Sequence, residues 1–253
     1  MQKKRISVYA LSITALLTAV SIILSNLSIM IPLFGFPALK FSISRVPLFF
    51  IGALFGPVLG GSAGFIIDMV SFMTTSTGVF HFGFTLNTIL LGVIPGIIFS
   101  KKQVPTSFNK YNLILAIVAL AGALIYINYI GIHTLETIDN FMGVPVNVAL
   151  SVLMVLLVIA LIIVIKILQT KFTQINIAFS IDKILFVCSI QYLIVNLILT
   201  PYWLNQVYNI PFVASSSVRV FKSIIDIPLQ VSLIYILGMV IVPVFKGKLV
   251  QNN

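Results

Sequence analysis

The segment "SSSVRVFKSIIDIPLQVSLIYILG" (residues 215–238) has the length and apolar character of a membrane-spanning helix, yet its first half contains Arg219, Lys222 and Asp226. Residues spaced three and four apart lie on one face of a helix. A charged side chain within a span is costly unless it pairs with another charge or faces the interior of a bundle. The segment therefore predicts a span that turns a charged face away from lipid.

The composition of the whole chain agrees with a membrane protein. Of its 253 residues, 60% are hydrophobic and only 8% are charged, against roughly 25% charged residues in soluble domains. About 20 apolar residues cross the hydrocarbon core as a helix. We therefore expect an all-α polytopic membrane protein with about eight spans, at residues 7–31, 43–60, 62–77, 84–100, 112–131, 145–169, 182–201 and 218–244.

The chain is expected to form one membrane domain over residues 1–253. Two of the candidate spans, 112–131 and 145–169, contain almost no polar residues, and polar tracts flank them on both sides. We interpret residues 105–175 as an inserted helical hairpin within a six-helix core formed by residues 7–104 and 176–248. Adding two spans leaves the topology of the rest unchanged.

The distribution of basic residues predicts an orientation. Lysines and arginines are enriched on the cytoplasmic side of membrane proteins. Both termini are therefore expected to be cytoplasmic in a multi-pass protein of the cell membrane. This places on the inner side Lys3, Lys4, Arg5, Lys101, Lys102, Lys110, Lys166, Lys171, Lys183, Lys246 and Lys248, and on the outer side only Lys40, Arg45, Arg219 and Lys222.

Three cations near the outer ends of spans are candidates for binding an anion. Lys222 and Asp226 can pair with each other, which either merely neutralises both or leaves Arg219 to engage a solute. Arg45 begins the second span, where an arginine can also extend to the interface. Charge-assisted hydrogen bonds between arginine and a carboxylate are strong, so these cations suit a carboxylated solute.

Asp68, in "GGSAGFIIDMVSF" (residues 60–72), is a carboxylate in the third candidate span. Three interpretations stay open for it. It can be a counter-ion for one of the cations, it can accept a hydrogen bond from a solute, or it can form a hydrogen bond that packs two helices. The glycines before it permit close approach of helices.

Two further segments supply polar and aromatic side chains. We expect outer loops in the first part of "TTSTGVFHFGFTLNTILLG" (residues 74–92) and in "LTPYWLNQVYNIPF" (residues 199–212). Aromatic residues at such positions usually form the interfacial belt, but rings and amides together can also bind a flat heterocycle. The candidate solute-binding residues in these segments are His81, Asn87, Tyr202, Trp203 and Asn205.

The sequence contains no motif for catalysis or for cofactor binding. There is no nucleophile–base arrangement, no cluster of metal ligands and no "GxxxxGK[ST]" phosphate-binding loop. We therefore expect neither a cofactor nor a metal, and not an enzyme. An intramembrane enzyme remains the alternative from another class, and it would require a compact pair of catalytic groups.

Four stretches resemble the S components of energy-coupling factor (ECF) vitamin transporters, most closely the folate-specific type. They are "ALLTA" (15–19), "KFSISRVPLFFIGALFGPVLGGSAGFIIDMVSF" (40–72), "FHFGFTLNTILLGVIPGIIF" (80–99), and "TPYWLNQVYNIPF" (200–212) followed by "RVFKSIIDIPLQ" (219–230). The resemblance implies six spans, cytoplasmic termini, and a substrate-binding subunit with an outward pocket for folate or a related carboxylated vitamin. Another vitamin or a queuosine precursor is the alternative solute.

The resemblance also implies partners. Members of this family act with a separate transmembrane coupling protein and two ATPase subunits, and an alanine-bearing first helix docks on the coupling protein. Carried over, that docking falls on Ala15 and Ala19. On spacing alone, these alanines would indicate ordinary helix packing.

Overall fold

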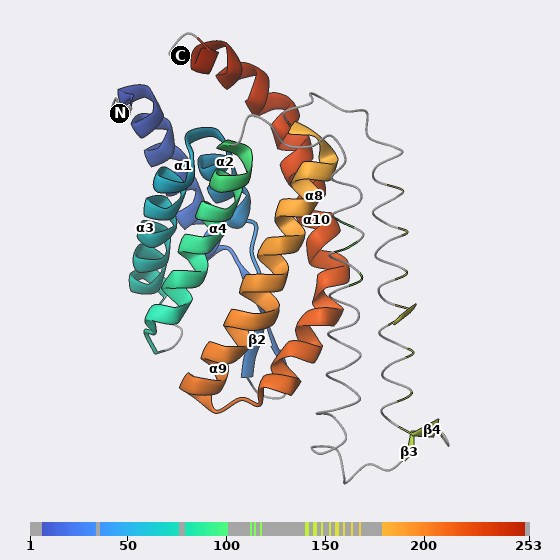
Figure 1. Ribbon diagram of the computed structural model, residues 1–253. Coiled ribbons are helices and arrows are strands. Elements are labelled where there is room, and N and C mark those ends of the chain that lie inside the picture. Colours follow the sequence, from blue (N-terminus) through green and yellow to red (C-terminus); the bar gives the residue numbers. More distant parts are fainter. Residues whose placement is uncertain are drawn as a thin grey trace.

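The computed structural model describes residues 7–33, 36–75, 79–100 and 179–250, together with isolated positions between residues 112 and 167. Figure 1 shows the described helices packed side by side, with the N-terminal and C-terminal ends on the same side of the bundle. The predicted hairpin at 105–175 lies almost entirely outside the described residues, so the count of eight spans is not tested.

Two groups of helices form the described bundle, as Figure 1 shows. Five helical segments of the described residues are long and apolar enough to cross a membrane, and α2 is a shorter apolar helix. The N-terminal group contains α1 (Val8–Asn26), α2 (Arg45–Phe55), α3 (Pro57–Thr75) and α4 (Phe82–Ser100). The C-terminal group contains α8 (Ile181–Gln191), the π-helix η2 (Tyr192–Leu199), α9 (Thr200–Tyr208) and α10 (Phe212–Val250).

The first span is shorter than the predicted segment 7–31, because α1 ends at Asn26 and the chain then forms a β-hairpin. Strand β1 (Ile29–Leu33) pairs antiparallel with β2 (Phe36–Phe41), and the register shifts between Ile31 and Leu33, around Pro32. Proline removes a backbone donor and breaks a helix. A second short pair joins β3 (Asn140–Phe141) to β4 (Val144–Pro145).

Two predicted boundaries were also wrong. The break expected between the candidate spans 43–60 and 62–77 lies instead at Gly56, whose φ of 95° is a left-handed conformation that glycine adopts without strain. Pro57 opens α3, where the missing N–H is not needed. The outer loop expected at 199–212 is mostly helix α9, which continues directly from η2, and only residues 209–211 are not helical.

Glycines bring α2, α3 and α4 into backbone contact. A Cβ atom added at Gly92 would overlap the carbonyl oxygen of Gly60, and one added at Gly52 or Gly60 would overlap the carbonyl oxygen of Gly92. The small-residue packing expected for this region is therefore present, and it holds the three helices at a fixed separation.

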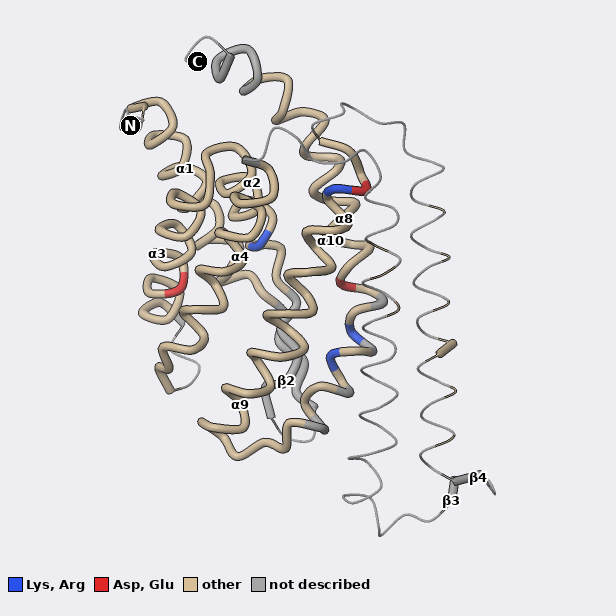
Figure 2. The backbone as a smooth tube through the Cα atoms, viewed as in Figure 1, with Lys and Arg blue, Asp and Glu red and all other residues tan. Residues whose placement is uncertain are grey.

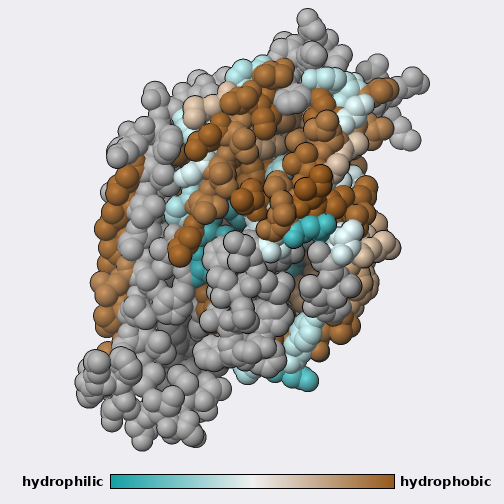
Figure 3. Space-filling model, turned by 180° about the vertical axis from the view of Figure 1, so that it is seen from behind, coloured by the Kyte–Doolittle hydropathy of each residue, from teal (hydrophilic) through white to brown (hydrophobic). Residues whose placement is uncertain are grey.

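On the face that Figure 3 shows, apolar side chains cover most of the upper part of the described surface, and hydrophilic side chains appear near the middle and at the lower edge. Helix α1 illustrates the arrangement, because its exposed face carries large apolar residues such as Leu16 and Ile23. Its buried residues, by contrast, are all hydroxylated: Thr14, Thr18, Ser21 and Ser25. In a soluble protein the buried face of a helix is apolar and the exposed face is polar. The opposite arrangement in α1 suits a protein whose exterior contacts lipid and whose interior is polar.

A hydrogen bond buried between α4 and α8 is among those that join the two groups of helices. Pro95 lies inside α4 and has no N–H to give to the carbonyl of Leu91, four residues earlier. The side-chain amide of Gln191 donates to that carbonyl at 2.6 Å, from the end of α8. Helix α4 therefore obtains a donor for the Leu91 carbonyl from a residue 100 positions away in the sequence.

Replacing Gln191 by leucine is expected to lower the stability of the chain by about 1–3 kcal/mol, because the Leu91 carbonyl loses its partner in a buried, water-poor position. Thermal unfolding of the detergent-solubilised protein measures this loss. The control is Gln206→Leu, since Gln206 is exposed and donates to the exposed Tyr202 hydroxyl. Equal melting temperatures for the two variants would contradict the assignment.

Candidate functional site

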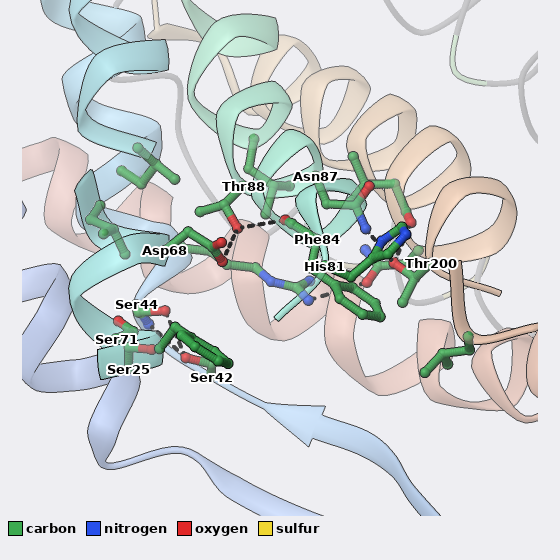
Figure 4. Close-up of a pocket in the computed structure, with 18 of the residues that line it drawn as sticks. Ser25, Ser42, Ser44, Asp68, Ser71, His81, Phe84, Asn87, Thr88 and Thr200 are labelled. Carbon is green, nitrogen blue, oxygen red and sulfur yellow. Dashed lines mark hydrogen bonds between the residues drawn. The ribbon is translucent and has the colours of Figure 1, made fainter. Parts of the chain in front are cut away.

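A cavity of about 340 Å³ lies between the two groups of helices. Figure 4 shows side chains from several elements pointing into it. Apolar and aromatic side chains form part of its wall, among them Leu48, Ile67, Phe72, Phe80, Phe84, Leu91, Val195 and Leu204. The volume is at the lower end of the range for small-molecule sites, roughly 300–1,000 Å³.

Arg45 lines this cavity from the N-terminal end of α2. Its guanidinium donates to the Asn196 side-chain oxygen at 3.1 Å and lies 3.5 Å from the Asp226 carboxylate. Its side chain is 22% exposed. Arg45 is therefore turned into the bundle, toward η2 and α10, and the interfacial alternative does not describe it.

Arg219 and Lys222 line the same cavity from α10. Lys222 lies 3.4 Å from Asp226, one turn further along the helix, and its side chain is only 2% exposed. The predicted Lys222–Asp226 pair is therefore present, but it is not isolated, because Asp226 also forms a salt bridge with Arg45. Figure 2 shows how few other charged residues the described helices carry.

The charges in this cluster do not balance. Arg45, Arg219 and Lys222 supply three positive charges, and Asp226 and the lining residue Asp68 supply two negative charges, which leaves 3 − 2 = +1 among these described residues. Arg219 is buried, and its Nε donates to the Ser215 hydroxyl at 3.4 Å. An excess of buried positive charge beside a cavity is stabilised by an anion. The cluster therefore has the charge of an anion-binding site.

Asn196, which the sequence analysis did not single out, holds Arg45 in place. It is buried in η2, and its amide oxygen accepts from the guanidinium. π-helical turns are rare and are frequent at functional sites. The widened helix continues into α9, and the Thr200 hydroxyl donates to the Val195 carbonyl at 2.6 Å. The only sequence signal was an asparagine within an apolar span.

Asp68 lines the cavity from α3 and is bound to α4. Thr85 donates to one carboxylate oxygen at 2.7 Å, and Thr88 donates to the other at 3.1 Å. Within the described part of the chain Asp68 forms no salt bridge, so it is not the counter-ion of Arg45, Arg219 or Lys222. The packing hydrogen bond is thus present, and the carboxylate nevertheless faces the cavity.

Serine hydroxyls form another part of the cavity wall, which the sequence analysis also missed. Figure 4 shows Ser25, Ser42, Ser44 and Ser71 close together. The hydroxyls of Ser42 and Ser44 are 2.7 Å apart, and Ser21 donates to the Ser44 carbonyl at 2.9 Å. These serines come from α1, the turn before α2, and α3, so no single stretch of sequence revealed them.

The predicted aromatic and amide residues divide into two sets. His81 and Asn87 line the cavity. Asn87 donates to the Thr200 hydroxyl at 3.1 Å and accepts from the Trp203 indole at 3.4 Å. The Trp203 ring packs on His81, with 5.3 Å between ring centroids. Trp203 is not itself a lining residue, so it supports His81 and Asn87 from behind.

Tyr202 and Asn205 lie outside the lining. Tyr202 is 48% exposed, and its hydroxyl accepts from Gln206. The Asn205 amide donates to the Ile210 carbonyl, which stabilises the end of α9. Because α9 is helical where a loop was expected, these two side chains are turned away from the face that carries Thr200 and Leu204.

The fold and the cavity define a class of protein: a helical multi-pass membrane protein with an internal polar site for a small solute. Comparison of the sequence with known families makes the class specific. The family described as "ECF transporter, substrate-specific component" matches residues 10–238. The chain belongs to this family, and it is therefore a component of a transporter and not an enzyme.

The chain is also similar to two individual proteins. The chain is 32% identical over 68 residues to the folate transporter FolT of Clostridium novyi (strain NT). That match covers 27% of this chain and 40% of the relative, so it spans less than half of that protein. The fold is similar to the crystal structure of FolT bound with folic acid, with a TM-score of 0.54 and 19% identity, over 90% of this chain and 93% of the other.

Proposed function

We propose that this chain captures folate, or a related carboxylated vitamin, from outside the cell and presents it to an ATP-driven uptake machinery. The observation that carries the proposal is the cluster of Arg45, Arg219 and Lys222 on the wall of one cavity inside an apolar bundle. Arg45 and Lys222 both pair with Asp226, Arg219 lies on the same wall, and a carboxylated solute adds negative charge beside these cations.

The remainder of the cavity suits the rest of folate. The glutamate tail of folate carries two carboxylates, and its pterin is flat and rich in hydrogen-bonding groups. The cavity offers phenylalanine rings, the serine hydroxyls and the Asn87 amide beside the cations. One of the relatives named above is a folate transporter by name, and the similar crystal structure holds folic acid, which favours folate over the other vitamins.

Titration calorimetry of the purified chain against a panel of vitamins tests the proposal. Folic acid is expected to bind most tightly, and mass spectrometry of the purified protein is expected to find a folate among co-purified small molecules. Tight binding of another vitamin or of a queuosine precursor, with none of folic acid, would overturn the choice of solute.

We infer that the chain works with a transmembrane coupling protein and two ATPase subunits and that both termini lie in the cytoplasm. Ala15 and Ala19 are exposed on α1, whereas the hydroxylated face of the same helix is buried. A partner helix can approach closely where side chains are small. The uncovered alanines therefore form a docking surface for the coupling protein.

Ala15→Trp and Ala19→Trp are each expected to abolish co-purification with the coupling protein, because an indole prevents close approach of the partner. Binding of folic acid should be unchanged, since neither alanine lines the cavity. The measurement is affinity capture of the complex followed by calorimetry of the isolated chain.

Val20→Trp is the matched control for the docking variants. Val20 is also exposed on α1, but it is displaced around the helix by roughly 140° from Ala15 and roughly 100° from Ala19. This control should assemble normally. Normal assembly of both alanine variants would show that the partner docks elsewhere.

A further inference from the structure

The two carboxylates near the cavity differ in their partners. Asp226 has two cations within salt-bridge distance, Arg45 and Lys222. Asp68 lines the cavity and has none among the residues that the structure describes. A carboxylate within a membrane-spanning helix requires compensation by hydrogen bonds or by opposite charge. The protein supplies ionic compensation to Asp226 and only hydroxyl groups to Asp68.

Those hydroxyl groups leave acceptor capacity on Asp68. An ionised carboxylate offers about four acceptor positions. Thr85, which is fully buried, donates to one oxygen, and Thr88 donates to the other. The Thr88 hydroxyl has a single hydrogen, and the Phe84 carbonyl at 3.2 Å competes for it. At least two acceptor positions of Asp68 therefore have no donor among the described residues.

The positions of Thr85 and Thr88 determine which side of the Asp68 carboxylate can accept hydrogen bonds from a solute. Thr85 and Thr88 are three residues apart on α4, so both hydroxyls approach the carboxylate from one helix. Figure 4 shows Asp68 beside Thr88 with its carboxylate at the cavity. A carboxylate held on one side by two hydroxyls is oriented to accept a pair of parallel N–H donors on the other.

We propose that Asp68 is a specificity-determining residue that accepts N–H hydrogen bonds from a planar edge of the solute, such as that of an amidine or a 2-aminopyrimidinone. This inference rests on the proposed function and makes it more specific. The site then selects solutes that combine two features: carboxylates for Arg45, Arg219 and Lys222, and an N–H edge for Asp68. Neither feature alone satisfies both charged parts of the cavity.

The test compares two ligands on two proteins by titration calorimetry. The ligands are folic acid and its 2-desamino-2-methyl analogue, which keeps both carboxylates and lacks the amino N–H donors. The wild-type chain is expected to prefer folic acid by about 10- to 100-fold, the loss typical of a charged hydrogen bond. In D68N the preference is expected to fall below about 3-fold, because a neutral amide replaces the charged acceptor.

A control variant and three outcomes make the test decisive. S62A alters an exposed hydroxyl on the same helix and should keep the wild-type preference. Equal affinities of the wild-type chain for the two ligands would overturn the role of Asp68, even if D68N does not fold. An unchanged preference in D68N would overturn it as well. Failure of the wild-type chain to bind folic acid at all would instead overturn the proposed function, and this inference with it.

Discussion

Gly92→Ala is expected to destabilise the chain by about 3 kcal/mol or more, because its Cβ would overlap the backbone of Gly60. Backbone atoms cannot rotate away as a flexible side chain can, so α3 and α4 would have to separate. That separation disturbs the helices that carry Asp68 and Asn87 into the cavity. Thermal unfolding and the yield of monodisperse protein in detergent measure the effect.

Gly238→Ala is the matched control for this glycine. A Cβ at Gly238 would meet the Phe179 ring at 3.6 Å and the Phe50 ring at 3.9 Å, which are ordinary van der Waals distances. The control should therefore unfold at the wild-type temperature. A Gly92 variant as stable as the Gly238 variant would show that α3 and α4 do not need backbone contact.

Arg45→Ala is expected to weaken the binding of folic acid by about 2–4 kcal/mol, which is the cost of removing one partner of a buried charge pair. A guanidinium has five N–H donors. Within the described residues two of those of Arg45 are occupied, by Asn196 and Asp226. The others can reach the solute. Arg219→Ala should cost about 1–3 kcal/mol for the loss of one charged hydrogen bond.

The fold should survive Arg45→Ala, since Asp226 keeps its pair with Lys222. Lys183→Met is the control for the loss of a buried cation. Lys183 is buried with its ammonium over the Phe99 ring and does not line the cavity. Calorimetry that gives Arg45→Ala the wild-type affinity, with the protein folded, would remove Arg45 from the site.

The charged part of the site could be predicted from the sequence because charge is rare in this chain. Arg219, Lys222 and Asp226 follow helical spacing in an apolar segment, and that spacing alone placed them on one face. The orientation of the Arg45 side chain could not be predicted, since an arginine at the end of a span can face either the interface or the interior. In the structure Arg45 faces the interior, where its guanidinium donates to Asn196, which lies 151 residues away in the sequence.

The hydroxyl and amide parts of the site required the tertiary structure. Serines and threonines are ordinary in membrane helices, and Ser25, Ser42 and Ser71 acquire meaning only where three elements meet. The π-helix η2 and the continuation of the helix into α9 could not be predicted from the sequence for another reason. The tract "TPYWLNQVY" has the composition of a loop, and tertiary packing of Pro201 and Leu204 makes it helical.

The central claim is that the cations of the cavity bind a carboxylated solute, and one comparison tests it most directly. Titration calorimetry compares the binding of folic acid to the wild-type chain with that of folic acid dimethyl ester, in which a neutral methyl ester replaces each tail carboxylate. The account predicts that the ester binds about 100-fold more weakly or not at all, because Arg45, Arg219 and Lys222 lose their counter-charge. Equal affinities for the acid and the ester would contradict it.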